Sequence, residues 1–141
     1  MPSIPSHAIG GVITGWGTAL PPKIVTNDDL SKTMDTSDEW IRERSGIEKR
    51  HIVSENQTCS DLSYFAAKEA LEQAGVDASL IDCIVVATTT PDHPCPATAT
   101  RVQEKLGAKN AFSFDVQAVC SGFVYAIAIA DNFIRTGQAK Y

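Results

Sequence analysis

The segment spanning residues 123–130, Phe-Val-Tyr-Ala-Ile-Ala-Ile-Ala, constrains the fold of this chain more than any other feature. It predicts a helix that is apolar on nearly every face, and such a helix is buried all round. A helix in the middle of an α/β domain needs a sheet on each side. The 141 residues contain only about three predicted strands, too few to cover the helix twice. The sequence therefore predicts the N-terminal portion of a larger fold.

Strand and helix patterns alternate along the chain, which is typical of an α/β layered fold with a mainly parallel sheet. The continuous apolar run after residue 82 fits a strand covered on both faces. Strands are expected at residues 11–18, 83–88 and 112–116, with another opening at 139–141. Five helices are expected, the first from residue 27 to about 34. The second begins after Thr36, the N-cap, which forms a capping box with Glu39, and it ends at Gly46. The others run from Thr58 or Ser60 to Gly75, from near Pro96 to Gly107, and from about Cys120 to Arg135.

Charge and cysteine usage exclude several classes of protein. The net charge of −5 argues against a protein that binds nucleic acid or an anionic membrane. The four cysteines form no CxxC pair, so neither a zinc ribbon nor a thioredoxin-type motif is expected. The uncharged stretch 116–130 is too short to span a bilayer, and the first residues lack the pattern of a signal peptide. We expect a leader at residues 1–9, one domain at 10–141 and a cytoplasmic location.

Cys120 lies where the strand at 112–116 turns into the long apolar helix, in the sequence Phe-Asp-Val-Gln-Ala-Val-Cys-Ser-Gly-Phe. Free N–H groups and the positive end of a helix dipole favour a thiolate at the first turn of a helix. Ser121 and Gly122 are small and leave space for a substrate. This pattern predicts an activated nucleophile. The alternative is a buried structural cysteine, because free cysteine is among the most buried residue types.

This segment resembles the nucleophile motif of the β-ketoacyl-acyl-carrier-protein synthase III family, within the thiolase-like condensing enzymes. The stretch Asp-Thr-Ser-Asp-Glu-Trp-Ile at residues 35–41, followed by Arg-Ser-Gly-Ile at 44–47 and by Arg50 and His51, is similar to that family's coenzyme-binding signature. The resemblance covers nearly the whole chain from Gly11 onward, and the family member is roughly twice as long. It implies the N-terminal half of a layered αβαβα thiolase-like fold, with a mixed, mainly parallel sheet and a buried central helix.

The resemblance also implies roles for individual residues. Cys120 matches the nucleophile that takes an acyl group from acyl-CoA, and its backbone N–H helps to form an oxyanion hole. Trp40 matches a residue that stacks on adenine, Arg44 one that meets phosphate, and Thr36 one that touches the nucleotide. Trp40 and Arg44 are four residues apart, so they share one helix face. The alternative is an ordinary amphipathic helix with Trp40 in the core and Arg44 solvated.

Cys95 falls where the family carries a bulky residue that closes the acyl tunnel across a dimer interface, and a smaller cysteine puts the length of the acyl primer in doubt. His93 and Cys95 by themselves make a weak metal pair, so no metal is expected. None of the three histidines, His7, His51 and His93, lies in the family's catalytic histidine motif. The half-site for acylation is expected here, and the half-site for condensation is not.

The function implied is a condensing acyltransferase that initiates fatty acid synthesis. Cys120 would be acylated by acyl-CoA, and the acyl group would then condense with malonyl-acyl-carrier protein to a 3-oxoacyl product with loss of CO2. The partners implied are acyl-CoA, the malonyl-carrier protein and a second copy of the intact enzyme, with no tightly bound cofactor. The alternatives are a related enzyme of polyketide or other secondary metabolism, and a truncated chain without catalytic activity.

Overall fold

The computed structural model describes residues 10–141, so the leader expected at residues 1–9 lies outside the described part of the chain. The chain divides into two compact units within the range expected as one domain. The larger unit comprises Met1–Ala19, described from Gly10 onward, and Cys59–Tyr141. The smaller unit is Leu20–Thr58. Each is described here by itself.

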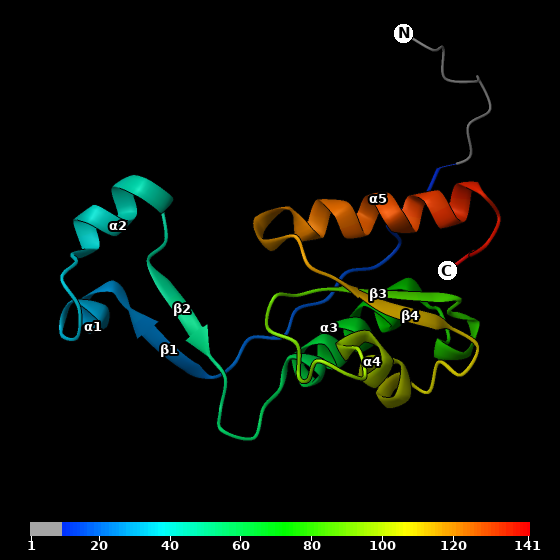
Figure 1. The fold of residues 1–141 in the computed structure, drawn as a ribbon, viewed down its shortest axis with the longest axis horizontal. Helices are drawn as coiled ribbons and strands as arrows, with labels where there is room; N and C mark the ends of the chain where they lie inside the picture. The colour runs from blue at the N-terminus through cyan, green and yellow to red at the C-terminus, as the bar shows by residue number, and fades with distance from the viewer. Residues whose placement is uncertain (1–9) are drawn as a thin grey trace, which may run out of the picture. The chain divides into compact units, whose positions relative to one another are not determined.

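The smaller unit is built from two short helices between two paired strands (Figure 1). Its elements are β1 (Lys23–Thr26), α1 (Asn27–Ser31), α2 (Asp38–Ser45) and β2 (Lys49–Ile52). The strands pair antiparallel, with Lys23 opposite Ile52 and Thr26 opposite Lys49. Neither strand was expected from the sequence, because each has four residues and the second, Lys-Arg-His-Ile, is mostly charged.

The first turn of α2 differs from the expected one by one residue. The N-cap is Ser37, whose side chain accepts a hydrogen bond from the backbone N–H of Trp40 at 3.1 Å. The prediction that Thr36 caps this helix with Glu39 in a capping box is wrong. Thr36 and Ser37 have equivalent cap chemistry, so the sequence alone does not discriminate between them. The expected stop is confirmed, because Gly46 adopts a left-handed φ of 70° at the C-cap.

The larger unit stacks helices on both faces of a parallel strand pair (Figure 1). β3 (Cys83–Ala87) pairs with β4 (Phe112–Val116), from Cys83 opposite Phe112 to Ala87 opposite Val116. In Figure 1, α5 (Gly122–Arg135) lies over one face of this pair, and α3 (Cys59–Ala74) and α4 (Thr98–Leu106) lie over the other. Two short 3-10 turns complete the unit, η1 (Ala78–Leu80) and η2 (Val119–Ser121). The expected strands at 83–88 and 112–116 are confirmed.

Residues 11–18 do not form the expected strand. Their backbone amides donate to side chains instead of to a neighbouring strand: Trp16 N to Gln73 Oε1 at 2.6 Å and Thr18 N to Glu69 Oε2 at 2.7 Å. Both acceptors lie on α3, and the segment approaches that helix so closely that a Cβ on Gly15 would lie 2.1 Å from the carbonyl oxygen of Ala70. The strand prediction is therefore wrong, because contacts with a helix take the place of a strand ladder.

The sequence predicts that the apolar helix is buried all round within a larger fold, and one side of it is exposed in the described residues. The side chains of Phe123 and Val124 are 70% and 62% exposed, and Gly122 is the one buried residue of α5. One face of α5 packs on the strand pair, where the Phe133 ring meets Phe112 and Phe114 edge-on, with centroids 5.0 and 6.1 Å apart. The opposite face meets solvent, because the described residues of the larger unit form only one sheet, the β3–β4 pair.

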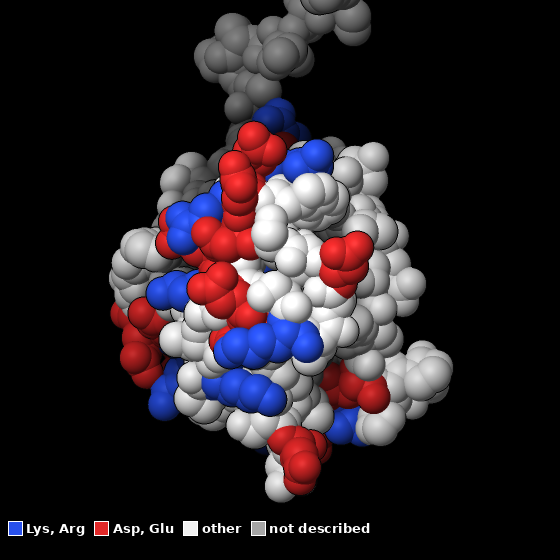
Figure 2. All heavy atoms as spheres, turned by 90° about the vertical axis from the view of Figure 1, so that its left-hand side faces the viewer, with Lys and Arg blue, Asp and Glu red and all other residues white. Residues whose placement is uncertain are grey.

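At residues 139–141 the backbone lies beside the start of β3 without being part of a strand. The carbonyl oxygen of Tyr141 accepts hydrogen bonds from the backbone N–H groups of Asp82 and Cys83, at 2.9 and 3.2 Å. No helix in the described part of the chain is long and apolar enough to cross a membrane. Figure 2 shows acidic and basic side chains interspersed on the face that it presents.

Candidate active site

Cys120 lies on the turn that connects β4 to α5. Its neighbours make this turn sharp: Val119 has a left-handed φ of 47°, and Ser121 N donates to the carbonyl oxygen of Ala118 at 2.9 Å. A β-branched residue rarely adopts a positive φ, so the backbone is strained beside the cysteine. Gly122 fits tightly, because a Cβ there would lie 3.2 Å from the Cβ of Ala87 at the end of β3. The turn therefore presents an exposed thiol at the ends of both strands.

The position of Cys120 corrects one detail of the sequence interpretation. It belongs to the 3-10 turn η2, and the α-helix begins two residues later at Gly122, so the cysteine is not in the first turn of α5. Ser121, the N-cap, makes no hydrogen bond from its side chain to the helix.

A cavity of about 660 Å³ opens next to Cys120 within the larger unit. Its lining is mainly apolar and combines β3 with α5 and α3; it includes Cys120, Val119, Phe123, Ile127, Val85 and Ala67. A space of this size and character is typical of a site for a small apolar group. The nucleophile candidate and an apolar cavity are thus brought together by the fold.

The other three cysteines differ from Cys120 in their surroundings. Burial raises the pKa of the Cys83 thiol, and the nearby Asp82 carboxylate adds to the rise. Cys59 Sγ lies 3.6 Å from Thr88 Oγ1 and is half-buried. Cys95 is exposed in the segment between β3 and α4, and it is not among the residues that line the cavity beside Cys120.

Trp40 and Arg44 lie next to each other on α2 in the smaller unit. The guanidinium carbon of Arg44 is 4.4 Å from the centroid of the Trp40 ring, and Arg44 Nη1 donates to the Trp40 carbonyl oxygen at 3.3 Å. The predicted shared helix face is confirmed. The Trp40 ring is 54% exposed, so the alternative that places it in the core is wrong. A flat aromatic ring with a cation against it presents a surface suited to a base and a phosphate.

Thr36 lies close to Trp40, although it does not cap the helix. A hollow of about 300 Å³ is lined by Asp35, Thr36, Ser37 and Trp40. Three consecutive residues of the loop and the indole ring therefore surround one space. Thr36 and Trp40 therefore line the same hollow.

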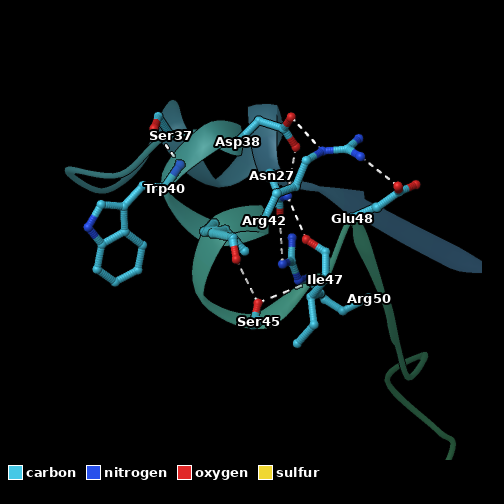
Figure 3. A network of polar contacts seen from close by, with 10 residues as sticks. Asn27, Ser37, Asp38, Trp40, Arg42, Ser45, Ile47, Glu48 and Arg50 are labelled. Carbon is cyan, nitrogen blue, oxygen red and sulfur yellow. Dashed lines mark hydrogen bonds and ion pairs between the residues drawn. The ribbon is translucent and has the colours of Figure 1, made fainter.

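Asn27 holds this part of the smaller unit in place (Figure 3). Its side chain is 1% exposed and donates from Nδ2 to Asp38 Oδ1 at 2.7 Å and to the Ile47 carbonyl oxygen at 2.8 Å. Its Oδ1 accepts from Arg50 Nη2 at 2.7 Å. These bonds join α1 to the first turn of α2 and to β2. Figure 3 shows the Trp40 ring directed away from this network.

The network also determines the charge state of Asp38. The hydrogen bond from Asn27, with the Arg42 guanidinium next, lowers the pKa of the Asp38 carboxyl below its ordinary value. Arg42 Nε lies 2.7 Å from Asp38 Oδ2, and Arg42 also pairs with Glu48. Sequence analysis treated residue 27 only as part of a helix start and missed this role, because its three partners lie at positions 38, 47 and 50.

A second residue that sequence analysis missed is Asp115 in the middle of β4. Its two carboxylate oxygens accept from the backbone N–H groups of Thr98 and Ala99, at 2.7 and 2.8 Å. The available signal was a single carboxylate in a strand whose other residues are Phe, Ser, Phe and Val. Among residues 10–141, no group of three or more His, Cys, Asp or Glu side chains is placed to hold a metal ion.

Comparison with known proteins identifies the relatives of this chain. A family model described as 3-oxoacyl-[acyl-carrier-protein (ACP)] synthase III matches residues 114–141, which include Cys120. A curated relative from Ehrlichia canis (strain Jake), named β-ketoacyl-[acyl-carrier-protein] synthase III, is 60% identical over 129 residues, covering 92% of this chain. The chain spans about 40% of the length of the curated relatives that it matches.

Solved structures agree with the sequence relatives. The crystal structure of 3-oxoacyl-[acyl-carrier-protein] synthase III from Aquifex aeolicus VF5 superposes with a TM-score of 0.85 and 48% identity, over 91% of this chain and 41% of that one. The priming β-ketosynthase of the R1128 polyketide pathway superposes with a TM-score of 0.86 and 33% identity, and the match covers 99% of this chain and 41% of that one. The expected resemblance to the synthase III family and the partial α/β thiolase-like fold are both confirmed.

Proposed function

We propose that this chain is the N-terminal portion of a β-ketoacyl-acyl-carrier-protein synthase III, and that Cys120 is the residue acylated in the first half of its reaction. The observation that carries the proposal is the exposed thiol on a strained strand–helix turn beside an apolar cavity. The turn lies within residues 114–141, the region that matches the synthase III family model. The 60% identity to a synthase III adds further support.

The first step is transfer of an acyl group between two thiols. The Cys120 thiolate attacks the carbonyl carbon of acyl-CoA, forming a C–S bond and a tetrahedral oxyanion. Backbone N–H groups at the turn, that of Cys120 among them, stabilise the oxyanion. The oxyanion then collapses, the bond to the CoA sulfur breaks, and the CoA thiolate leaves with its electron pair. The acyl chain remains on Cys120 and occupies the apolar cavity.

The second step consumes the acyl group. Malonyl-acyl-carrier protein loses CO2, and the carbanion that results attacks the Cys120 thioester to give the 3-oxoacyl product and the free thiol. The histidine and asparagine that the family uses for this step are not provided by the motifs of this chain. His51 Nδ1 lies 2.6 Å from the carbonyl oxygen of Pro21, and His93 is exposed on the segment before α4.

Coenzyme A is the ligand proposed for the exposed face of α2. The adenine stacks on Trp40, Arg44 meets a phosphate, and Thr36 contacts the nucleotide from the adjacent hollow. No tightly bound cofactor is needed, because the thioester supplies the activated acyl group. The Cys95 position is proposed to border the acyl site across the interface of a homodimer. The four free thiols fit a reducing, cytoplasmic location.

A second function, in which the same acyl transfer primes a polyketide, is supported by one observation. The structure named as a priming β-ketosynthase matches 99% of this chain with a TM-score of 0.86, although its identity is lower, at 33%. The truncated chain without activity remains the third candidate, because only about 40% of the relatives' length is spanned. The identity of the accepted acyl-CoA distinguishes the first two.

The test is a single-turnover acylation of the full-length protein that contains this chain. Incubation with acetyl-CoA and no malonyl-carrier protein should release one equivalent of CoA and add one acetyl group to the Cys120 peptide. The Cys120→Ser variant should release none, and Cys59→Ser should behave as the parent protein. Acylation on a different cysteine, or CoA release unaffected by Cys120→Ser, would refute the assignment.

A further inference from the structure

Val119 directly precedes Cys120 and has a backbone conformation that valine rarely adopts. Its φ of 47° lies in the left-handed region, where a β-branched residue is an outlier. Its side chain is 76% exposed, so little burial of that side chain offsets the strain. Residues held in strained conformations cluster at functional sites, where the surrounding structure maintains them. The strain therefore indicates that Val119 has a role beside the thiol.

Backbone hydrogen bonds within the turn fix the direction of the Val119 side chain. The Val119 carbonyl oxygen accepts from the backbone N–H of Gly122, and Ser121 N donates to the Ala118 carbonyl oxygen at 2.9 Å. Gly122 is itself buried, and a Cβ added to it would lie 3.2 Å from the Cβ of Ala87. A β-branched side chain is in addition stiff about χ1. Val119 thus presents its two methyl groups in a nearly fixed position.

Val119 is also the only large side chain among the residues that flank Cys120 in this turn. The others are Ala118, Ser121 and Gly122, all of which are small. Val119 and Cys120 both line the apolar cavity of about 660 Å³ that is proposed to hold the acyl chain. The carbon next to the thioester carbonyl stays close to the sulfur of an acylated Cys120. Val119 is therefore placed to contact that part of the acyl group.

We propose that Val119 makes Cys120 selective for straight-chain acyl groups. Its methyl groups border the part of the cavity beside the thiol and disfavour an acyl group that carries a branch at the carbon next to the carbonyl. The carbons farther along a straight chain pass Val119 and enter the cavity. This inference rests on the proposed function, because it takes Cys120 as the acylated residue and the cavity as the acyl site.

Butyryl-CoA and isobutyryl-CoA test this, because the two are isomers that differ only in branching at that carbon. The full-length protein that contains this chain is incubated with each one, without malonyl-carrier protein. The rate of CoA release and mapping of the Cys120 peptide measure acylation. The parent protein should react faster with the straight isomer, and equal rates would contradict the inference. In Val119→Ala the ratio of the isobutyryl rate to the butyryl rate should rise about tenfold, since one methylene group in an apolar pocket changes a rate by about 10–200-fold.

Val119→Thr and Val124→Ala are the matched controls. Threonine has the same branched shape as valine, so Val119→Thr should keep the ratio of the parent protein. Val124 is another exposed valine, at 62%, and it lies on α5, but it is not among the residues that line the cavity. Val124→Ala should therefore also keep the ratio. A rise in Val124→Ala equal to that in Val119→Ala would overturn the inference.

Val119→Gly is the second variant, and it serves if Val119→Ala does not fold. Glycine adopts a positive φ without strain, so this variant relieves the backbone while it removes both methyl groups. Its ratio should rise at least as far as that of Val119→Ala. Normal acylation by acetyl-CoA with an unchanged ratio in Val119→Gly overturns only the role of Val119. Failure of the parent protein to acylate Cys120 with any of these acyl-CoAs, acetyl-CoA included, overturns the proposed function itself.

Discussion

At the scale of single residues, the four cysteines differ in their exposure and in their surroundings. Cys120 and Cys95 are exposed, Cys59 is half-buried, and burial raises the pKa of Cys83. Cys59 is the first residue of α3 and Cys120 lies two residues before α5, so both are at the start of a long helix, but only Cys120 of the two is exposed.

We therefore predict that Cys120 reacts fastest with iodoacetamide near neutral pH, followed by Cys95, with Cys83 slowest. Peptide mapping after brief alkylation of the native protein measures this order. Because Cys95 is also exposed, it serves as the internal control for exposure. Labelling of Cys83 at the rate of Cys120 would contradict the assignment of the nucleophile.

The exposed pair on α2 predicts a loss of coenzyme binding on mutation. Trp40→Ala in the full-length protein should weaken acyl-CoA binding by about 1–3 kcal/mol, the scale of base–aromatic stacking. Arg44→Ala should weaken it more at low salt than at high salt, because its proposed partner is a phosphate. Calorimetric titration with acyl-CoA at two salt concentrations measures both.

Trp16→Ala is the control for this pair, because Trp16 is also largely exposed, at 68%, and lies in the other unit. Its acyl-CoA dissociation constant should match that of the parent protein. Unchanged affinity in both Trp40→Ala and Arg44→Ala would remove α2 from the coenzyme site.

At the scale of secondary-structure elements, one buried amide connects most of the smaller unit. The Asn27 side chain donates hydrogen bonds to the Asp38 carboxylate and to the Ile47 carbonyl oxygen, and it accepts one from Arg50. Asn27 is itself buried, and its removal takes away three hydrogen bonds, each with a net contribution of about 0.5–1.5 kcal/mol. The helix α2, which carries Trp40 and Arg44, depends on this network for its attachment to β2.

Asn27→Ala should therefore lower the free energy of local unfolding of α2 by at least about 1 kcal/mol. Amide hydrogen exchange in residues 38–45 of the native protein measures it. Asn110→Ala is the control, since its single hydrogen bond, to the Ser79 carbonyl at 3.3 Å, is exposed. Equal exchange of α2 in the two variants would show that the Asn27 network does not hold the helix.

Prediction of the elements from sequence succeeded where the local signal was strong. The apolar, β-branched run at 83–88 located β3, the predicted bounds of β4 are those observed, and Gly46 and Gly107 end α2 and α4 as expected, both with left-handed φ. It failed for residues 11–18, because nothing in that stretch of sequence reveals that its backbone amides donate to side chains on α3. It also missed β1 and β2, which are short and stabilised mainly by each other.

At the scale of the whole molecule, α5 is the feature that most affects behaviour. Phe123, Val124 and Tyr125 are each more than half exposed, although all three are large. Covering one such side chain is worth about 1.5–3 kcal/mol. An apolar helix face of this kind promotes association unless other chain covers it.

Residues 1–141 expressed alone should therefore bind a hydrophobic dye, self-associate, and show no condensation of acetyl-CoA with malonyl-carrier protein. Dye fluorescence, light scattering and a condensation assay measure these properties. The double variant Phe123→Ser, Val124→Ser should bind less dye. A monodisperse, dye-silent fragment with normal condensation would contradict both the missing half-site and the fold boundary.

The sequence by itself determined the local properties of this protein: a cysteine between a strand and a helix, a Trp and an Arg on one helix face, and an α/β alternation with too few strands for its most apolar helix. These depend on residues adjacent in the chain, whose periodicity and caps act over a few positions. Only the tertiary structure decided that Asp115 holds the start of α4, that Asn27 joins positions 38, 47 and 50, and that residues 11–18 lie against α3. The physical reason is that a buried polar group must find a partner wherever the folded chain supplies one, and sequence distance does not indicate where that is.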